Sequence, residues 1–77
     1  MKLIYDEESG IPTNLKEGDE LFLFDSEAGA LHFCTFQSYG TDKNQERTVT
    51  VVEDGGKKTY TAEGIADIVL QADYPCR

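Results

Sequence analysis

The sequence contains few of the residues that usually carry a specific chemistry. Its 77 residues include one histidine, two cysteines and two prolines. Two cysteines do not make a disulfide framework, and so few prolines among 39% apolar residues argue against a disordered chain. No apolar stretch approaches the ~20 residues that span a bilayer, and the N-terminus lacks the basic segment and apolar run of a signal peptide. We therefore expect a globular, cytoplasmic protein that does not enter a membrane.

The length limits the domain organisation. A chain of this size buries only about 60% of its unfolded surface and has room for a single core. We predict one domain over residues 1–77. Residues 15–70 form its body, residues 1–14 are an N-terminal extension or an edge strand plus a loop, and residues 71–77 are a tail.

Basic residues are scarce as well. Fifteen acidic side chains face seven basic ones, a net charge of −8, which repels phosphate backbones and disfavours direct binding of DNA or RNA. The first thirty residues hold eight acids and two bases, whereas the other 47 hold seven acids and five bases. We expect these thirty residues to build much of any functional face. The alternative is a solvated acidic surface that only keeps the protein soluble.

The segment Glu20–Asp25, ELFLFD, is the first predicted strand. Alternation places Leu21 and Leu23 on one face and Phe22 and Phe24 on the other, so both faces are apolar. Such a strand is either covered on both sides or exposes one row of side chains as an adhesive surface.

A second strand is predicted over Leu31–Tyr39, after a hairpin turn at residues 26–30. Its apolar phase moves from Leu31 and Phe33 to Cys34 and Phe36, which indicates a bulge or a sharp bend near Thr35. Residues 40–46 contain no apolar side chain and are predicted to form a loop.

The β-branched segment Arg47–Glu53 is the third predicted strand. The pair Asp54-Gly55 is a hairpin signal, because aspartate followed by glycine easily adopts the positive φ of a tight turn. The fourth strand is expected over residues 57–62, a single helical turn over 63–66, and a short last strand over 67–70. The run KLIY at residues 2–5 has β character and could add an edge strand.

This order of elements resembles the SH3-like small β-barrels. The residues that carry the resemblance are Gly18-Asp19, the long second strand, Asp54-Gly55 at the hairpin and Ile65–Leu70, and it covers most of residues 15–70. We predict an all-β fold, a five-stranded SH3-like barrel or a strongly bent antiparallel sheet with one helical turn. The resemblance implies a scaffold that binds partners and seldom catalyses. The chain lacks the aromatic and proline-recognition motifs of SH3 domains proper, and residues 1–14 lie outside the pattern.

No motif predicts an enzyme, a cofactor or a metal site. His32 and Cys34 would share a strand face, but a nucleophile also needs an oxyanion site and an orienting group, and zinc needs more ligands with other spacing. An edge histidine and a packed cysteine explain the pair better. Cys76 is expected to be an incidental thiol near the chain end. The acidic runs do not place oxygens at the alternating positions of a calcium loop.

Two functional hypotheses remain. The first is a non-enzymatic interaction module that docks a basic protein surface, for example that of a nucleic-acid-binding protein. The second is a nucleic-acid mimic of the kind that mobile elements use, whose carboxylates fill the DNA- or RNA-binding groove of a host nuclease. A homodimer that buries the two-faced strand or KLIY is a further option. The predicted partner-binding residues are Tyr5, Glu7, Glu8, Asp19, Glu20, Phe22, Phe24, Asp25, Glu27 and Tyr39.

Overall fold

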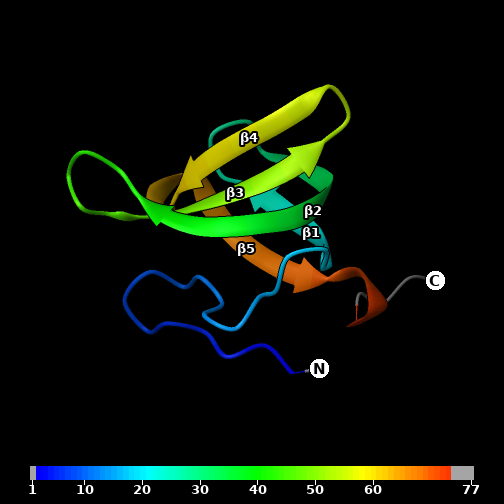
Figure 1. The fold of residues 1–77 in the computed structure, drawn as a ribbon, viewed down its shortest axis with the longest axis horizontal. Coiled ribbons are helices and arrows are strands. Elements are labelled where there is room, and N and C mark those ends of the chain that lie inside the picture. The colour runs from blue at the N-terminus through cyan, green and yellow to red at the C-terminus, as the bar shows by residue number, and fades with distance from the viewer. Residues whose placement is uncertain (1, 74–77) are drawn as a thin grey trace.

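A computed structural model of the chain describes residues 2–73, which contain one antiparallel five-stranded sheet (Figure 1). The strand order is β4-β3-β2-β1-β5, so β4 and β5 form the two edges and the sheet does not close into a barrel. The all-β prediction is confirmed in its form of a bent open sheet. The strands are β1 Glu20–Asp25, β2 Ala30–Thr41, β3 Arg47–Glu53, β4 Gly56–Thr61 and β5 Ile65–Leu70, with 3-10 turns η1 Ala62–Gly64 and η2 Gln71–Asp73.

The predicted strands are present with small differences at their ends. β1 and β3 have the predicted bounds, whereas β2 is longer at both ends. The helical turn begins one residue earlier than predicted, at Ala62, and ends two residues earlier, at Gly64. It ends there because Ile65 is already extended and its side chain is buried in the core. β5 therefore begins two residues before its predicted start. The hairpin between β3 and β4 is also confirmed, with the positive φ on Gly55 and Gly56.

The predicted irregularity in the second strand is present. The pairing of β2 with β3 shifts between Phe36 and Ser38, about two residues after the predicted position at Thr35. Cys34 and Phe36 point into the core, and the extra residue Gln37 lets Tyr39 pack against the same core. A bulge bends its strand, which explains how one twelve-residue strand pairs with β1 at one end and β3 at the other.

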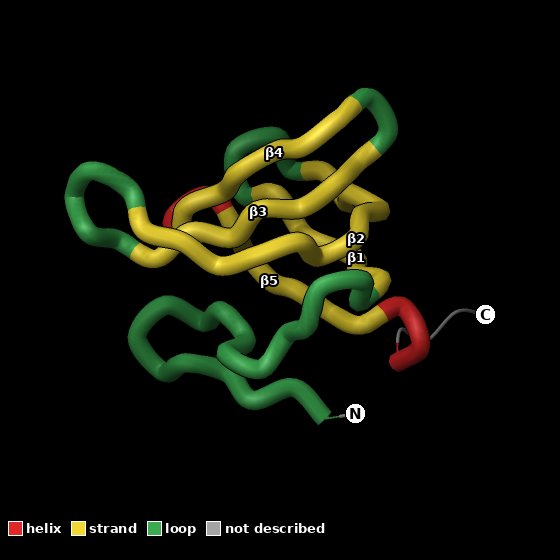
Figure 2. The backbone as a smooth tube through the Cα atoms, in the orientation of Figure 1, coloured by secondary structure: helices red, strands yellow, loops and turns green. Residues whose placement is uncertain are grey.

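The inner face of the sheet is covered by the N-terminal segment. Figure 2 shows this segment as a loop below the sheet, beside β5. Ile11 and Pro12 are fully buried and Leu15 is nearly so, against Leu21, Leu23 and Ile68 of the strands. Ile11 and Pro12, which the sequence pattern left outside the body of the domain, therefore help to complete its core.

Residues 2–5 do not form a strand of the sheet. Tyr5 makes an isolated bridge with Pro12, and the amide of Asp6 donates to the carbonyl of Ile11 at 3.0 Å. The segment thus folds back on itself as a short hairpin. Among the described residues, no helix is long and apolar enough to cross a membrane.

Candidate functional site

The outer face of the sheet carries a cluster of apolar side chains. Alternation turns Phe22 and Phe24 away from the core, and the register sets Phe33 opposite Phe22 and Leu31 opposite Phe24. The rings of Phe22 and Phe33 meet edge to face, with centroids 5.2 Å apart. Val69 lies opposite Phe22 on the other side of β1. Together with Val52, these side chains form what we call the outer apolar face: Phe22, Phe24, Leu31, Phe33, Val52 and Val69.

Three members of the outer apolar face are strongly exposed. Phe33 is 67% exposed, Leu31 45% and Val52 41%, whereas Phe22, Phe24 and Val69 are half-buried. Val52 pairs with Thr35, two residues from Phe33 on the same side of β2, so the cluster is continuous across four strands. Apolar side chains gathered in this way on a small protein are typical of an interaction surface.

Charged side chains border this face. Glu20 pairs with Thr35 and Asp67 pairs with Phe24, so both carboxylates lie on the outer side of the sheet beside the apolar cluster. Lys57, opposite Val52, contributes one ammonium at the β4 side. All three side chains are exposed. The arrangement offers apolar contact together with carboxylates that can pair with lysine or arginine.

The predicted partner-binding residues divide between this face and other places. Glu20, Phe22 and Phe24 lie on it. Asp25 is buried on the inner side, where its Oδ1 accepts the amides of Ala28 at 3.0 Å and Glu27 at 2.9 Å. These bonds, with the Ala28 amide foremost, hold the pKa of Asp25 below its usual value. Asp19 accepts the amide of Lys16 at 2.8 Å. Both aspartates thus shape turns.

The two predicted tyrosines hold the N-terminal segment against the sheet. The Tyr39 hydroxyl accepts the amide of Leu15 at 3.1 Å and donates to the carbonyl of Pro12, and burial raises its pKa. Its ring packs on Phe36. The Tyr5 hydroxyl donates to the carbonyl of Ile68 in β5 at 3.0 Å. Both phenols therefore make contacts within the domain.

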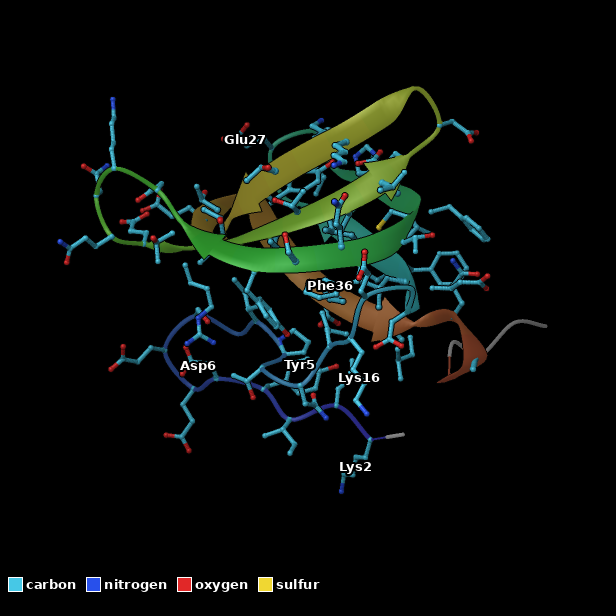
Figure 3. The ribbon with its side chains drawn as sticks, viewed as in Figure 1. Lys2, Tyr5, Asp6, Lys16, Glu27 and Phe36 are labelled. Atoms are coloured by element: carbon cyan, nitrogen blue, oxygen red, sulfur yellow. The ribbon has the colours of Figure 1, made fainter. Side chains whose placement is uncertain are left out.

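The remaining predicted acids, Glu7, Glu8 and Glu27, are exposed but do not lie together. Glu8 lines a hollow with Arg47 and the loop before it, whereas Glu27 is in the turn between β1 and β2. Figure 3 shows Glu27 above β4 in this view and Asp6, the neighbour of Glu7, below the strands in the N-terminal segment, so the two residues are far apart. The acids of the first thirty residues are thus distributed over several surfaces.

The single histidine is held between two carboxylates at one end of the inner face. His32 Nε2 lies 3.2 Å from Asp25 Oδ2, and His32 Nδ1 lies 3.1 Å from Glu53 Oε1. The Tyr60 hydroxyl donates to Glu53 Oε2 at 2.9 Å, and burial followed by this bond raises the Tyr60 pKa. Lys58 Nζ lies 5.0 Å from the centre of the Tyr60 ring. The cluster ties the ends of four strands together and occupies both nitrogens of the imidazole.

Cys34 is a buried thiol beside this cluster. Burial, and then the Glu53 carboxylate, raise its pKa to about 11, so the thiol is protonated at neutral pH and is a poor nucleophile. The prediction of a packed cysteine is confirmed for Cys34, whereas Cys76 lies outside the described residues. Within residues 2–73, no three or more histidine, cysteine, aspartate or glutamate side chains are placed to hold a metal ion.

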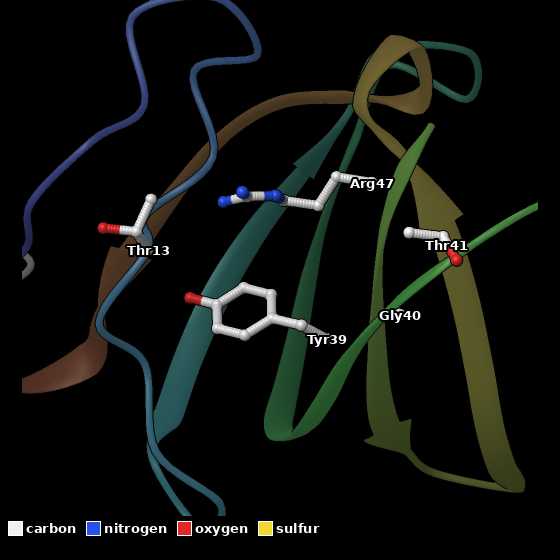
Figure 4. Close-up of a pocket in the computed structure, with 5 residues that line it drawn as sticks. All are labelled: Thr13, Tyr39, Gly40, Thr41 and Arg47. Atoms are coloured by element: carbon white, nitrogen blue, oxygen red, sulfur yellow. The ribbon is translucent and has the colours of Figure 1, made fainter. Parts of the chain in front are cut away.

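A hollow of about 420 Å³ lies between the N-terminal segment and β2 (Figure 4). It is lined by Thr13, Tyr39, Gly40, Thr41 and Arg47. Figure 4 shows the Tyr39 ring and the Arg47 side chain reaching toward the segment that carries Thr13. The hollow is wide open to solvent, and the Tyr39 hydroxyl already bonds Pro12 and Leu15. It offers a small ligand one exposed guanidinium and little enclosure.

Sequence reasoning did not assign Leu31, Phe33, Val52, Val69 or Asp67 to a site. A signal for the first two was present, since Leu31 and Phe33 alternate in phase with the apolar row of Phe22 and Phe24. Val69 and Asp67 gave no such signal, because their position beside β1 follows from pairing between the first and last strands.

The comparisons with known proteins yield no relative. No family model matches the chain, and no curated protein or solved structure matches it.

Proposed function

We propose that the domain is a non-enzymatic protein-binding module that docks a basic protein partner on the outer apolar face. The observation that carries the proposal is the exposure of Phe33 and Leu31 on a sheet face bordered by the carboxylates of Glu20 and Asp67. The order of elements along the sequence, which resembles that of SH3-like barrels, also implies a scaffold that binds partners and seldom catalyses.

The two parts of this surface have different roles. Burial of a large aromatic side chain in an interface supplies much of the affinity. Phe33 is the most exposed large apolar side chain within residues 2–73. Carboxylates at the border contribute to encounter rate and to the choice of partner, and this contribution weakens with salt. A net charge of −8 makes basic surfaces the preferred partners.

The apolar part is tested with the variant Phe33→Ser and the matched control Ile4→Ser. Ile4 is 62% exposed but lies in the N-terminal segment, so the control removes a similar exposed surface elsewhere. We expect capture of basic proteins by the immobilised domain to fall about tenfold with Phe33→Ser and to persist with Ile4→Ser. Equal capture by both variants would contradict the proposal.

The charged part is tested with Glu20→Lys against Glu8→Lys, which change the net charge equally at two different surfaces. Glu20 is preferable to Asp19, because the Asp19 carboxylate holds the amide of Lys16 and its removal would also alter a turn. We expect Glu20→Lys to weaken capture at low salt more than Glu8→Lys. Equal losses would mean that net charge alone governs binding.

The nucleic-acid mimic is separated from this proposal by competition. A mimic needs carboxylates gathered as phosphates are on a duplex. Glu27 and Asp6 instead lie far apart, above and below the strands in Figure 3. If a captured partner binds DNA, it should bind the DNA and this domain together. If DNA and the domain instead exclude each other from the partner, and still do so with the Phe33→Ser variant, the result would support the mimic.

A further inference from the structure

The outer apolar face has dimensions that restrict what can cover it. It extends over four strands, from Val69 of β5 to Val52 of β3, and along β2 from Leu31 to Thr35. With strands ~4.8 Å apart and ~3.3 Å per residue, this is a surface of roughly 14 by 13 Å. An α-helix with its side chains is about 10–12 Å wide, so two to three turns of one helix would cover the face.

The pairing of the strands limits the form of the bound segment. β1 is paired on both sides, with β2 and with β5, so the backbone beneath Phe22 and Phe24 is fully paired. β2 pairs with β3 only from Thr35 onward, and β5 is an edge strand, so a strand added at either place would lie beside the face and would not cover it. An extended peptide laid across these apolar side chains would bury N–H and C=O groups without partners, which is costly. A helix satisfies these groups internally and presents only side chains.

The border charges define the polar part of the bound segment. Glu20 lies at the start of β1 and Asp67 lies beside Phe24, so the two carboxylates flank the face near β1 and β5. A second copy of this chain would bring two carboxylates, the single Lys57 ammonium and its own net charge of −8 into the interface, so acidic groups would outnumber basic ones there. A helix with lysine or arginine beside its apolar stripe would pair with the carboxylates instead.

We propose that the partner presents a basic amphipathic helix, whose apolar stripe packs on Phe33 and Leu31 and whose basic side chains approach Glu20 and Asp67. This inference rests on the proposed function and specifies the chemistry of the partner at the same surface.

A model peptide tests the inference directly. The probe is a synthetic peptide of about 18 residues, ~27 Å as a helix, with leucine along one helical face and lysine on the other. Its control has the same composition with leucine and lysine alternating, which disfavours an amphipathic helix. Fluorescence anisotropy of the labelled peptides gives the dissociation constants. Because the domain is all-β, a gain of ellipticity at the helical wavelength in the mixture reports on the peptide.

We expect the helical probe to bind about tenfold more tightly than the alternating control, to gain helicity, and to lose about tenfold in affinity with Phe33→Ser but not with Ile4→Ser. A cooperative urea unfolding transition shows that Phe33→Ser is folded. Replacing the lysines of the probe by glutamates should abolish binding at low salt.

The alternative outcomes distinguish the two levels of the proposal. Both peptides could bind equally well, lose affinity with Phe33→Ser and gain no helicity. That result would overturn the helix and leave the proposed protein-binding function standing. Absence of Phe33-dependent binding for peptides and for basic proteins would overturn both. A mass of two chains by light scattering, reduced to one by Phe33→Ser, would assign the face to a second copy and overturn the basic helix.

Discussion

The two faces of β1 have similar side chains and different surroundings. Leu21 and Leu23 point inward and are fully buried, whereas Phe22 and Phe24 point outward and are half-buried beside the exposed Phe33. The inner row is covered because the N-terminal segment brings Ile11 and Pro12 across the open side of the sheet. Hydrophobicity alone therefore does not distinguish a core face from an exposed face. What distinguishes them is which face the chain itself returns to cover.

The largest difference between the faces should appear in stability. We expect Leu23→Ala and Ile11→Ala each to lower the free energy of unfolding by about 2–5 kcal/mol, because both side chains are fully buried and their removal leaves cavities. Urea unfolding measures the loss. A small effect of Ile11→Ala alone would mean that the N-terminal segment is not part of the cooperative core.

An intermediate effect concerns the polar end of the inner face under acid. The lowered pKa of Asp25 means that the folded state binds its proton less tightly than the unfolded chain does. The contribution of Asp25 to the stability of the fold is present above the ordinary aspartate pKa of about 4. It is lost as the pH falls through the lower pKa that Asp25 has in the folded state. In the Asp25→Asn variant, the urea midpoint should therefore fall less steeply as the pH is lowered than it does in the parent protein. An unchanged pH dependence of the midpoint would mean that other carboxylates cause the loss of stability in acid.

A second pH effect has the opposite direction. The Cys34 pKa, raised to about 11 from an ordinary value near 9, means that the unfolded thiol ionises before the folded one. The contribution of Cys34 to stability is complete below about pH 9 and is lost as pH rises toward about 11. In Cys34→Ala, the urea midpoint should fall less steeply as the pH rises above about 9. The midpoint at neutral pH should also be lower, because a buried side chain has been shortened. The raised pKa of Tyr60 acts in the same direction, so Tyr60→Phe should reduce what remains of the fall at alkaline pH.

The smallest expected change in stability is that of Phe33→Ala on the outer face. Its ring is two-thirds exposed and touches Phe22, so we expect a loss of at most about 1 kcal/mol, the value of one aromatic pair. A loss as large as that of Leu23→Ala would make Phe33 a structural residue and would remove the contrast between the faces.

The sequence allowed the prediction of local structure but not of the contacts between segments that are distant in the chain. The bounds of β1 and β3, the hairpin at Gly55 and the irregularity in β2 followed from alternation and turn chemistry, which act over a few residues. The burial of Ile11 could not be predicted, since it depends on a contact between the first segment and strands formed much later in the chain. The clustering of Val69 with Phe22 has the same cause.

The candidate site shows the same limit. Glu20, Phe22 and Phe24 were predicted from the two-faced strand, and they lie on the outer apolar face. Asp25 and Tyr39 have the residue types of an acidic, aromatic surface, yet backbone groups take up their polar atoms. One partner of Asp25 is the amide of Ala28 in the same turn, whereas one partner of Tyr39 is the amide of Leu15, which is distant in the sequence. Residue type predicts what a side chain can bind, whereas the fold decides which partner it meets first.

The two free edges of the sheet differ in how they resist polymerisation. β4 carries two exposed lysines, Lys57 and Lys58, whose charges repel the edge of another molecule. β5 is apolar along much of its length, and there the Tyr5 hydroxyl binds the carbonyl of Ile68, so the N-terminal segment serves as a built-in guard against fibrillar stacking. We therefore expect that a protease that removed the first ten residues would expose the β5 edge and promote aggregation.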